Sequence, residues 1–181
     1  IMNILITGSN GQLGTELQDI LASGQAEIGP ISPVYKDAQV TAIDVDTLDI
    51  TDESAVMAFF ESGNFDLAIN SAAFTNVDAC EEKEELAYKV NAEGPANLAK
   101  ACQKFGAKFV HVSTDYVFPG TDPVPRKESD PTGPISAYGR TKLAGEELVA
   151  LNCDKYYILR TAWLYSKTGK NFVKTMLELG D

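Results

Sequence analysis

Short apolar runs alternate with longer amphipathic stretches along the 181 residues of this chain. The apolar runs are rich in Val and Ile without strict polar alternation, which is typical of parallel strands buried on both faces. The predicted strands are Asn3–Thr7, Val40–Ile43, Leu67–Asn70, Lys108–Ser113 and Tyr156–Arg160. Helices are predicted near residues 12–22, 52–62, 79–104 and 136–151, and a last one begins near Asn171. This order predicts an α/β fold, a Rossmann-like doubly wound parallel sheet with helices on both faces.

Two segments interrupt the alternation and are predicted to be loops. Residues 24–38 contain Pro30 and Pro33, and residues 117–136 contain five prolines. A loop as long as the second one is usually a lid or a binding loop, so we expect it beside the functional site. The acid-rich stretch Asp78–Glu85 is predicted to be a solvated helix face.

Residues 1–181 are long enough for one complete domain with a sizeable core, but not for two. We therefore expect one NAD(P)-binding, Rossmann-like domain. The predicted sheet is not followed by a second lobe that could close over a substrate, so we expect the substrate lobe to be missing or truncated.

Composition narrows the function classes. The chain has 44% hydrophobic and 23% charged residues, as ordinary globular proteins do. Its net charge of −11 disfavours nucleic-acid partners, and no apolar run approaches the roughly 18 residues of a membrane helix. Three scattered cysteines and one histidine predict a reduced, cytoplasmic protein without a disulfide scaffold or a metal site.

The first predicted strand runs into the sequence Gly8-Ser9-Asn10-Gly11-Gln12-Leu13-Gly14 and then into a predicted helix. Glycines allow a tight turn, close backbone approach to a pyrophosphate and close packing of helix on strand. The helix N-terminus adds free N–H groups and a partial positive charge. We therefore predict dinucleotide binding here; the alternative is a plain tight turn. The GxxGxxG spacing resembles that of the extended short-chain dehydrogenase/reductase superfamily.

Three further residues are candidates for binding the adenosine half of a dinucleotide. Asp44 lies at the end of the second predicted strand, where an acid accepts hydrogen bonds from the ribose. Asp49 and Ile50 resemble the pair that lies beside the adenine in the superfamily named above. For Asp49 the alternative is a cap of the helix that begins near residue 52.

Tyr138 and Lys142 form a YxxxK pair, which a helix places on one face, one turn apart. Tyrosine is a sluggish acid near neutral pH, and we expect the lysine ammonium to lower its pKa. Tyr138 could then protonate a ketone oxygen as hydride arrives, while Thr114, at a strand end, hydrogen-bonds the same oxygen. The alternative for Tyr138 is a half-exposed tyrosine at a helix start.

Four blocks of sequence resemble the dTDP-4-dehydrorhamnose reductase family: Asn70–Asp78, Val112–Gly120, Tyr138–Glu146 and Arg160–Tyr165. The resemblance implies NAD(P)H-dependent reduction of the 4-keto group of dTDP-4-dehydro-L-rhamnose, and it allows a homodimer. By the same resemblance a sugar nucleotide would contact Thr75, Val77, Thr114, Asp115, Tyr116, Tyr138 and Trp163. The cofactor would contact Gly8, Asn10, Gly11, Gln12, Leu13, Gly14, Asp44, Asp49, Ile50, Ala72, Ala73, Phe74, Val112, Tyr138 and Lys142.

Phe74 departs from the family pattern, where a histidine or small polar residue is expected. Two other functions stay open. One is a sugar-nucleotide epimerase or dehydratase of the same superfamily; dehydratases carry a glutamate where Tyr116 stands here. The other is a non-catalytic, reductase-like regulatory subunit. For the cofactor we expect NADH in preference to NADPH, because Asp44 would repel a 2′-phosphate and no arginine precedes Arg126.

Pro95 lies inside the predicted helix 79–104, where it cannot donate to the carbonyl of Asn91. One interpretation is a kink, or a helix break at Gly94-Pro95. The other is that the free carbonyl holds a water that bridges to Lys142.

Overall fold

Five parallel strands form the central sheet in the computed structural model of this chain, which describes residues 1–180. The strands are β1 (Asn3–Thr7), β4 (Gln39–Ile43), β5 (Leu67–Asn70), β6 (Lys108–Thr114) and β7 (Tyr156–Thr161). Their order in the sheet is β4-β1-β5-β6-β7. The predicted fold class is confirmed, and each predicted strand agrees with the structure to within one residue at either end.

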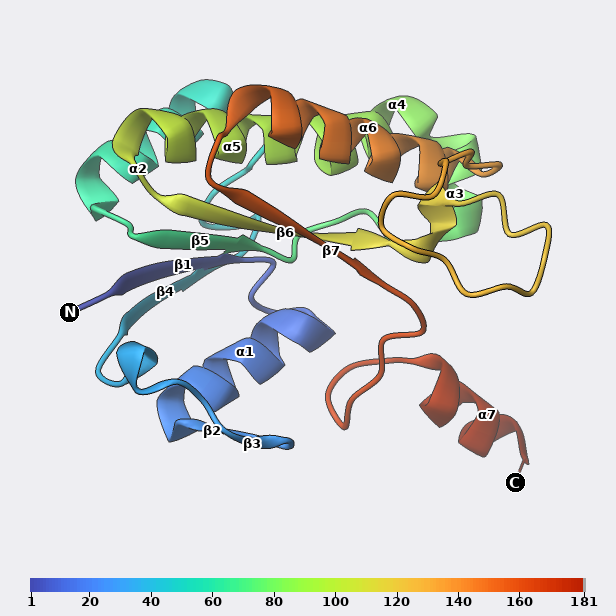
Figure 1. The fold of residues 1–181 in the computed structure, drawn as a ribbon, viewed down its shortest axis with the longest axis horizontal. Coiled ribbons are helices and arrows are strands. Elements are labelled where there is room, and N and C mark those ends of the chain that lie inside the picture. Colours follow the sequence, from blue (N-terminus) through green and yellow to red (C-terminus); the bar gives the residue numbers. More distant parts are fainter. Residues whose placement is uncertain (181) are drawn as a thin grey trace.

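The helices are α1 (Gln12–Ser23), α2 (Glu53–Gly63), α3 (Val77–Glu82), α4 (Glu84–Tyr88), α5 (Gly94–Phe105), α6 (Ala137–Asn152) and α7 (Phe172–Gly180). In Figure 1 the helices α2, α5 and α6 cover one face of the sheet, and α1 lies on the other. None of these helices is long and apolar enough to cross a membrane.

The structure corrects two expectations about local structure. The segment 24–38 is not only a loop: β2 (Gln25–Ala26) and β3 (Gly29–Pro30) form a small antiparallel hairpin. A 3₁₀ turn, η1 (Pro33–Tyr35), follows it. Strands of two residues are too short for an alternating pattern to reveal.

The predicted helix 79–104 is divided into four pieces. Lys83 leaves the helical conformation between α3 and α4 (φ −130°, ψ 47°). A π-helical turn, η2 (Lys89–Glu93), then joins α4 to α5. Because Pro95 has no N–H to donate, the chain widens before it, so the helix continues through the proline. Of the alternatives for Pro95, the helix break at Gly94-Pro95 is therefore wrong.

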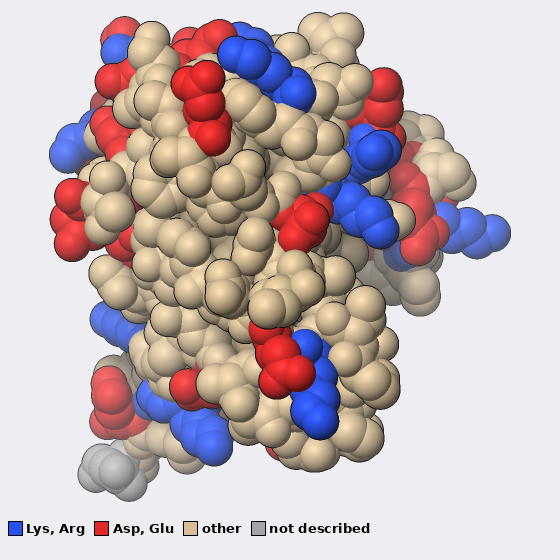
Figure 2. All heavy atoms as spheres, turned by 90° about the vertical axis from the view of Figure 1, so that its left-hand side faces the viewer, with Lys and Arg blue, Asp and Glu red and all other residues tan. Residues whose placement is uncertain are grey.

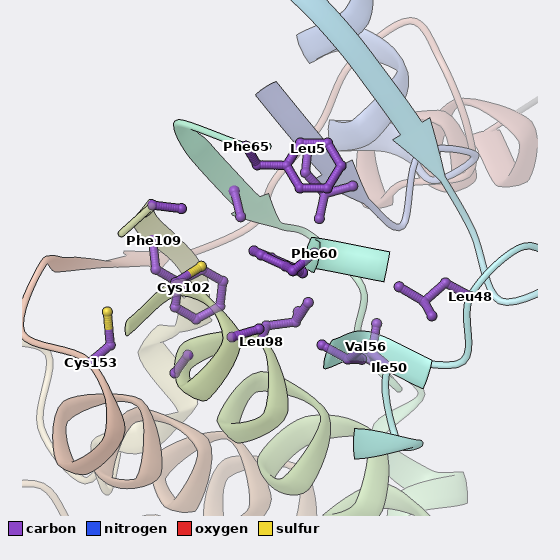
Figure 3. Close-up of a cluster of buried hydrophobic side chains, with 14 of the residues drawn as sticks. Leu5, Leu48, Ile50, Val56, Phe60, Phe65, Leu98, Cys102, Phe109 and Cys153 are labelled. Carbon is purple, nitrogen blue, oxygen red and sulfur yellow. The ribbon is translucent and has the colours of Figure 1, made fainter. Parts of the chain in front are cut away.

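The main core lies between the sheet and the helices α2 and α5. Phe60, Leu98 and Phe109 meet there, all fully buried. Figure 3 shows these three side chains pointing toward one another from α2, α5 and β6. Burial of such large apolar side chains is the dominant favourable contribution to folding, and here it fixes α5 on the sheet.

The strand order reverses between β1 and β5, because β4 lies on one side of β1 and β5, β6 and β7 lie on the other. In open α/β sheets such a switch point, at the carboxyl ends of the strands, forms the ligand crevice. Figure 2 shows the opposite end of the molecule, where the strands begin. Acidic and basic side chains are interspersed on that face, around a largely uncharged centre.

Candidate active site

The glycine-rich turn lies at the switch point. Gly8 has a left-handed backbone (φ 66°), and a Cβ on it would lie 2.6 Å from the backbone nitrogen of Ala72, after β5. A Cβ on Gly14 would lie 2.3 Å from the carbonyl oxygen of Gly8. Both glycines are therefore required, the first by conformation and close approach, the second by the packing of α1 on the turn.

The N-terminus of α1 is open toward the crevice. Gly11 is its N-cap and offers no side-chain acceptor, and no acidic residue stands in the first turn. Its free N–H groups and partial positive charge suit a phosphate group. Asn10, Gln12 and Leu13, which were predicted to contact the cofactor, lie beside this N-terminus. The Gln12 amide, however, donates to the carbonyl of Leu164 at 3.0 Å and accepts from Asn171 at 3.0 Å, so it holds the segment after β7.

Asp44 lies next to the glycine turn. One of its carboxylate oxygens accepts a hydrogen bond from the Asn10 N–H at 3.0 Å, and the other accepts from Val45 N–H at 2.8 Å. Asp49 is exposed and accepts from the backbone N–H and the hydroxyl of Thr51, at 2.9 and 2.7 Å. It caps this turn, whereas Asp52 caps α2. The Ile50 side chain is buried in the core against Gly94, and its carbonyl accepts from the Asn97 amide at 3.0 Å.

The segment from Ala72 to Phe74 follows β5 and is half-buried. The buried side-chain amide of Asn91, in η2, holds this segment. Its oxygen accepts from the Phe74 N–H at 2.7 Å, and its nitrogen donates to the Phe74 carbonyl at 3.0 Å. The same nitrogen is 3.1 Å from the Thr141 hydroxyl of α6. The predicted cofactor residues of this segment are therefore fixed relative to the helix that carries Tyr138 and Lys142.

Thr114, Tyr138 and Lys142 converge at the carboxyl end of β6. Ser136 caps α6 and so places Tyr138 in its first turn. Lys142, one turn later, is buried, and its ammonium donates to the Val112 carbonyl of β6 at 2.7 Å. The hydroxyl of Thr114 lies close enough to the Tyr138 phenol to affect its pKa. The three predicted catalytic side chains therefore share one site.

The pKa of Tyr138 differs from the expectation. Burial of the phenol raises its pKa, the Thr114 hydroxyl partly opposes this increase, and nearby Cys80, Asp115 and Tyr116 add to it. The Lys142 ammonium does not lower it, because that group is directed to the carbonyl of Val112. A raised pKa keeps the phenol protonated at neutral pH, which is the state that a proton donor needs.

Burial also changes the pKa of Lys142. Desolvation lowers the pKa of its ammonium to about 8, and the negative charge of Glu146 partly counteracts this decrease. His111, beside it on β6, stays neutral at physiological pH, because burial lowers its pKa well below the usual value and Lys142 adds to the decrease. A lysine with a pKa near neutrality beside a tyrosine is typical of a functional site.

The predicted substrate residues do not form one compact group. Tyr116 is near Tyr138, their rings edge to face with centroids 5.5 Å apart. Asp115 accepts from the Thr114 hydroxyl at 3.1 Å. Thr75 is exposed after β5, and Val77 begins α3. Trp163 lies beyond β7, 71% exposed, with its ring against Phe172 of α7.

Sequence reasoning missed two groups of side chains at this site. One is a hydrogen-bonded row across three strands. The Thr7 hydroxyl donates to the Asn70 amide oxygen at 2.6 Å, and the Asn70 amide nitrogen is 3.1 Å from Nδ1 of His111. The other is the ion pair of the buried Glu146 with the partly exposed Arg160, at 2.6 Å. Both join residues far apart in the chain, so no local pattern reveals them.

Two hollows of the surface lie away from the catalytic side chains. One, of about 950 Å³, is at the amino ends of the strands and includes Tyr35, Lys108 and Tyr157. The other, of about 1110 Å³, lies between α1 and residues 164–168. Neither is lined by Thr114, Tyr138 or Lys142. Within residues 1–180 no group of three or more His, Cys, Asp or Glu could hold a metal ion.

Comparison with known proteins identifies the relatives of this chain. Residues 2–181 match the family described as RmlD substrate binding domain. The dTDP-4-dehydrorhamnose reductase of Salmonella typhimurium is 43% identical over 98% of this chain and 56% of its own length. This chain therefore spans about half the length of the curated relatives that it matches.

Two solved structures share the fold closely. The dTDP-4-dehydrorhamnose reductase of Clostridium acetobutylicum superimposes with a TM-score of 0.90 at 51% identity, over 99% of this chain and 59% of that one. The enzyme of the same name from Bacillus anthracis, in complex with NADP, gives a TM-score of 0.87 at 43% identity, over the same shares of the two chains.

Proposed function

Since this chain belongs to the family of the RmlD substrate binding domain, we propose that it is the cofactor-binding and proton-donating part of a dTDP-4-dehydrorhamnose reductase. The reaction would be the reduction of the 4-keto group of dTDP-4-dehydro-L-rhamnose to the alcohol of dTDP-L-rhamnose. The curated relative from Salmonella typhimurium carries this name and is 43% identical.

One observation carries the proposal: a half-buried tyrosine with a raised pKa stands beside a threonine hydroxyl at the strand ends where the glycine turn also lies. A carbonyl reduction needs a protonated acid and a hydrogen-bond donor aimed at the same oxygen. Tyr138 and Thr114 supply these two groups. The open N-terminus of α1 supplies the anion-binding element that a dinucleotide needs.

The chemistry then divides among the residues as follows. A reduced nicotinamide dinucleotide, when bound, supplies the hydride. Thr114 donates a hydrogen bond to the keto oxygen while negative charge develops on it. Tyr138 transfers its phenolic proton to that oxygen, so the ketone becomes a secondary alcohol and the tyrosine a phenolate. Lys142 is protonated below its pKa of about 8, and its ammonium holds the Val112 carbonyl at the end of β6, so it would keep a positive charge beside the strand end that carries Thr114.

For the cofactor we infer a preference for NADH over NADPH. The Asp44 carboxylate lies beside the glycine turn through its bond to Asn10, and its charge would repel a 2′-phosphate. Residues 1–125 contain no arginine that could bind such a phosphate in bidentate fashion. The structure of the Bacillus anthracis relative contains NADP, so the preference for NADH has to be tested by measurement.

The homodimer stays a prediction.

The deciding experiment is turnover by the full-length protein. With dTDP-4-dehydro-L-rhamnose and NADH, we expect one nicotinamide to be oxidised for each dTDP-L-rhamnose formed, followed by absorbance and by NMR of the product. An epimerase or dehydratase would change the sugar without net consumption of the nicotinamide. A regulatory subunit would bind the dinucleotide, measured by calorimetry, without any turnover. Either outcome would contradict the proposal.

A further inference from the structure

Glu146 extends the line of functional side chains on α6. It follows Lys142 by four residues, as Lys142 follows Tyr138, so the three lie on one face of the helix at successive turns. The Glu146 side chain is only 6% exposed. A buried carboxylate requires compensation by a positive charge and hydrogen bonds.

Arg160 of β7 supplies that compensation. Its Nε donates to one oxygen of Glu146 at 2.9 Å and its Nη2 to the other at 2.6 Å, a bidentate pair. The guanidinium also reaches the proline-rich loop, residues 117–136. It lies over the Phe118 ring, 5.0 Å from the centroid, and its Nη1 donates to the Glu128 carbonyl at 3.3 Å. Glu146 therefore fixes a cation that ties this loop to β7 and to α6.

We propose that Glu146 is a positioning residue for Lys142: its carboxylate, held by Arg160, keeps the buried ammonium charged, and the same pair fixes the loop that follows Thr114. The charge on Lys142 is a property of the fold, but its use in catalysis rests on the proposed function. Glu146 contacts neither the Thr114 hydroxyl nor the Tyr138 phenol among the hydrogen bonds of residues 1–180, so it acts through Lys142 and Arg160.

The charges around Lys142 show which group stabilises its protonated form. Within residues 1–180, Glu146 on α6 and His111 on β6 interact with the ammonium, and Arg160 lies behind Glu146. Tyr138 stands one turn before Lys142 on α6. Tyr138 and His111 are uncharged at neutral pH, because burial raises the pKa of the first and lowers that of the second. Glu146 is thus the anion that opposes the desolvation of Lys142.

Other charges near α6 act elsewhere. On α3 and α4, Glu81 accepts from the Ala137 N–H at 2.7 Å and Glu84 pairs with Arg140 at 3.0 Å, both at the first turn of α6. On η2, Lys89 and Glu93 are exposed to solvent. Solvent screens such charges strongly, so they are poor substitutes for Glu146.

The test follows the titration of Lys142 directly. In protein labelled at the lysine side chains, the Cε resonance of Lys142 is assigned by its disappearance in Lys142→Met, and its shift is recorded against pH. In the unchanged chain the midpoint is expected at about 8. Glu146→Gln keeps the shape and one acceptor for Arg160, and it should lower the midpoint by about one pH unit. Glu146→Asp, which restores the charge, should return most of that change.

Two matched variants separate the charge of Glu146 from a merely structural role. Glu147→Gln makes the same substitution at the next residue of α6, which is exposed, and should leave the midpoint where it is. Arg160→Gln removes the counter-ion and should move the midpoint upward, opposite to Glu146→Gln, because the carboxylate then acts on Lys142 without partial neutralisation. This second variant also decides the matter if Glu146→Gln does not fold.

An unchanged midpoint in Glu146→Gln, or a shift of the same sign in Glu146→Gln and Arg160→Gln, would overturn the proposal. Because NMR titration needs no substrate or cofactor, these outcomes do not depend on the proposed reductase activity. In the full-length enzyme, activity should be lost at lower pH in Glu146→Gln than in the unchanged protein.

Discussion

The side-chain amide of Asn91 pairs with both backbone groups of Phe74, accepting from its N–H at 2.7 Å and donating to its carbonyl at 3.0 Å. This is the pattern of two adjacent strands, made here by one side chain. It joins the widened turn of the helix before Pro95 to the segment that we expect to lie beside the nicotinamide. The position of that segment therefore depends on a residue outside the predicted cofactor and substrate sites.

Replacing Asn91 with alanine should lower both stability and cofactor affinity. The Phe74 N–H and carbonyl would lose their partners, at about 1 to 3 kcal/mol for each group left unpaired. Urea unfolding and calorimetric titration with NADH measure the two effects. Asn152→Ala is the matched control, since that amide donates only to the Leu148 carbonyl at the end of α6. Full cofactor affinity in Asn91→Ala would show that the Phe74 segment does not bind the cofactor.

Tyr138→Phe should abolish reduction and leave NADH binding nearly intact, because only the proton donor is lost. Loss of a general acid reduces kcat by about 10² to 10⁴-fold. Tyr157→Phe, an exposed tyrosine of β7, serves as the control. Lys142→Ala, by contrast, should damage both kcat and cofactor affinity. If Tyr138→Phe retained the kcat of the unchanged enzyme, another acid would have to donate the proton.

Lys142→Met should raise the stability of the chain at pH 7. The pKa of Lys142 is lowered from 10.5 to about 8 by folding, so between these values the unfolded chain binds more protons and stability rises with pH. Below pH 8 the folded state carries the full cost of the buried charge, at most about 3 kcal/mol. The variant also loses the hydrogen bond from the ammonium to the Val112 carbonyl, which makes the increase in stability smaller.

Urea unfolding of the two proteins at pH 7 and above pH 10 checks this. The stability advantage of Lys142→Met should be largest at pH 7 and should shrink as the lysine of the unfolded reference chain also becomes neutral. A variant that is less stable by the same amount at both pH values would show that burial of the ammonium carries no such cost.

Gly145→Ala should destabilise the chain by about 1 to 3 kcal/mol, the usual cost of overpacking. A Cβ at this position would lie 2.2 Å from the Asn91 carbonyl oxygen, and backbone on both sides prevents relief. Gly180→Ala is the control, since a Cβ there meets nothing within 4 Å. Thermal unfolding compares the two, and an unchanged midpoint in Gly145→Ala would mean that α6 and η2 are farther apart in solution.

The water bridge from the Asn91 carbonyl to Lys142 stays a prediction.

NADH should have the higher kcat/KM of the two nicotinamide cofactors. Asp44→Ser should narrow the difference by relieving the repulsion of a 2′-phosphate, with Asp46→Ser, an exposed acid two residues later, as its control. A tenfold preference of the unchanged enzyme for NADPH would show that the charge of Asp44 does not select the cofactor.

Local patterns in the sequence were sufficient to predict those features of the fold that depend only on residues close together in the chain. The turn from Gly8 to Gly14 follows from steric rules within a few residues, and the YxxxK spacing of Tyr138 and Lys142 follows from the helical period. The strands are recognisable because burial on both faces requires continuous apolar runs. The short hairpin of residues 25–30 was not predicted, because a strand of two residues is too short to show an alternating pattern of apolar and polar side chains.

Tertiary structure alone decided how these parts act on one another. The sequence does not contain the order of the strands, which brings Gly8 against Ala72 and Arg160 against Glu146. Nor could the pKa of Tyr138 be predicted with the right sign, because it depends on burial and on where the Lys142 ammonium points. Desolvation and long-range pairing are properties of the packed chain, whereas turns and helical faces are properties of its neighbouring residues.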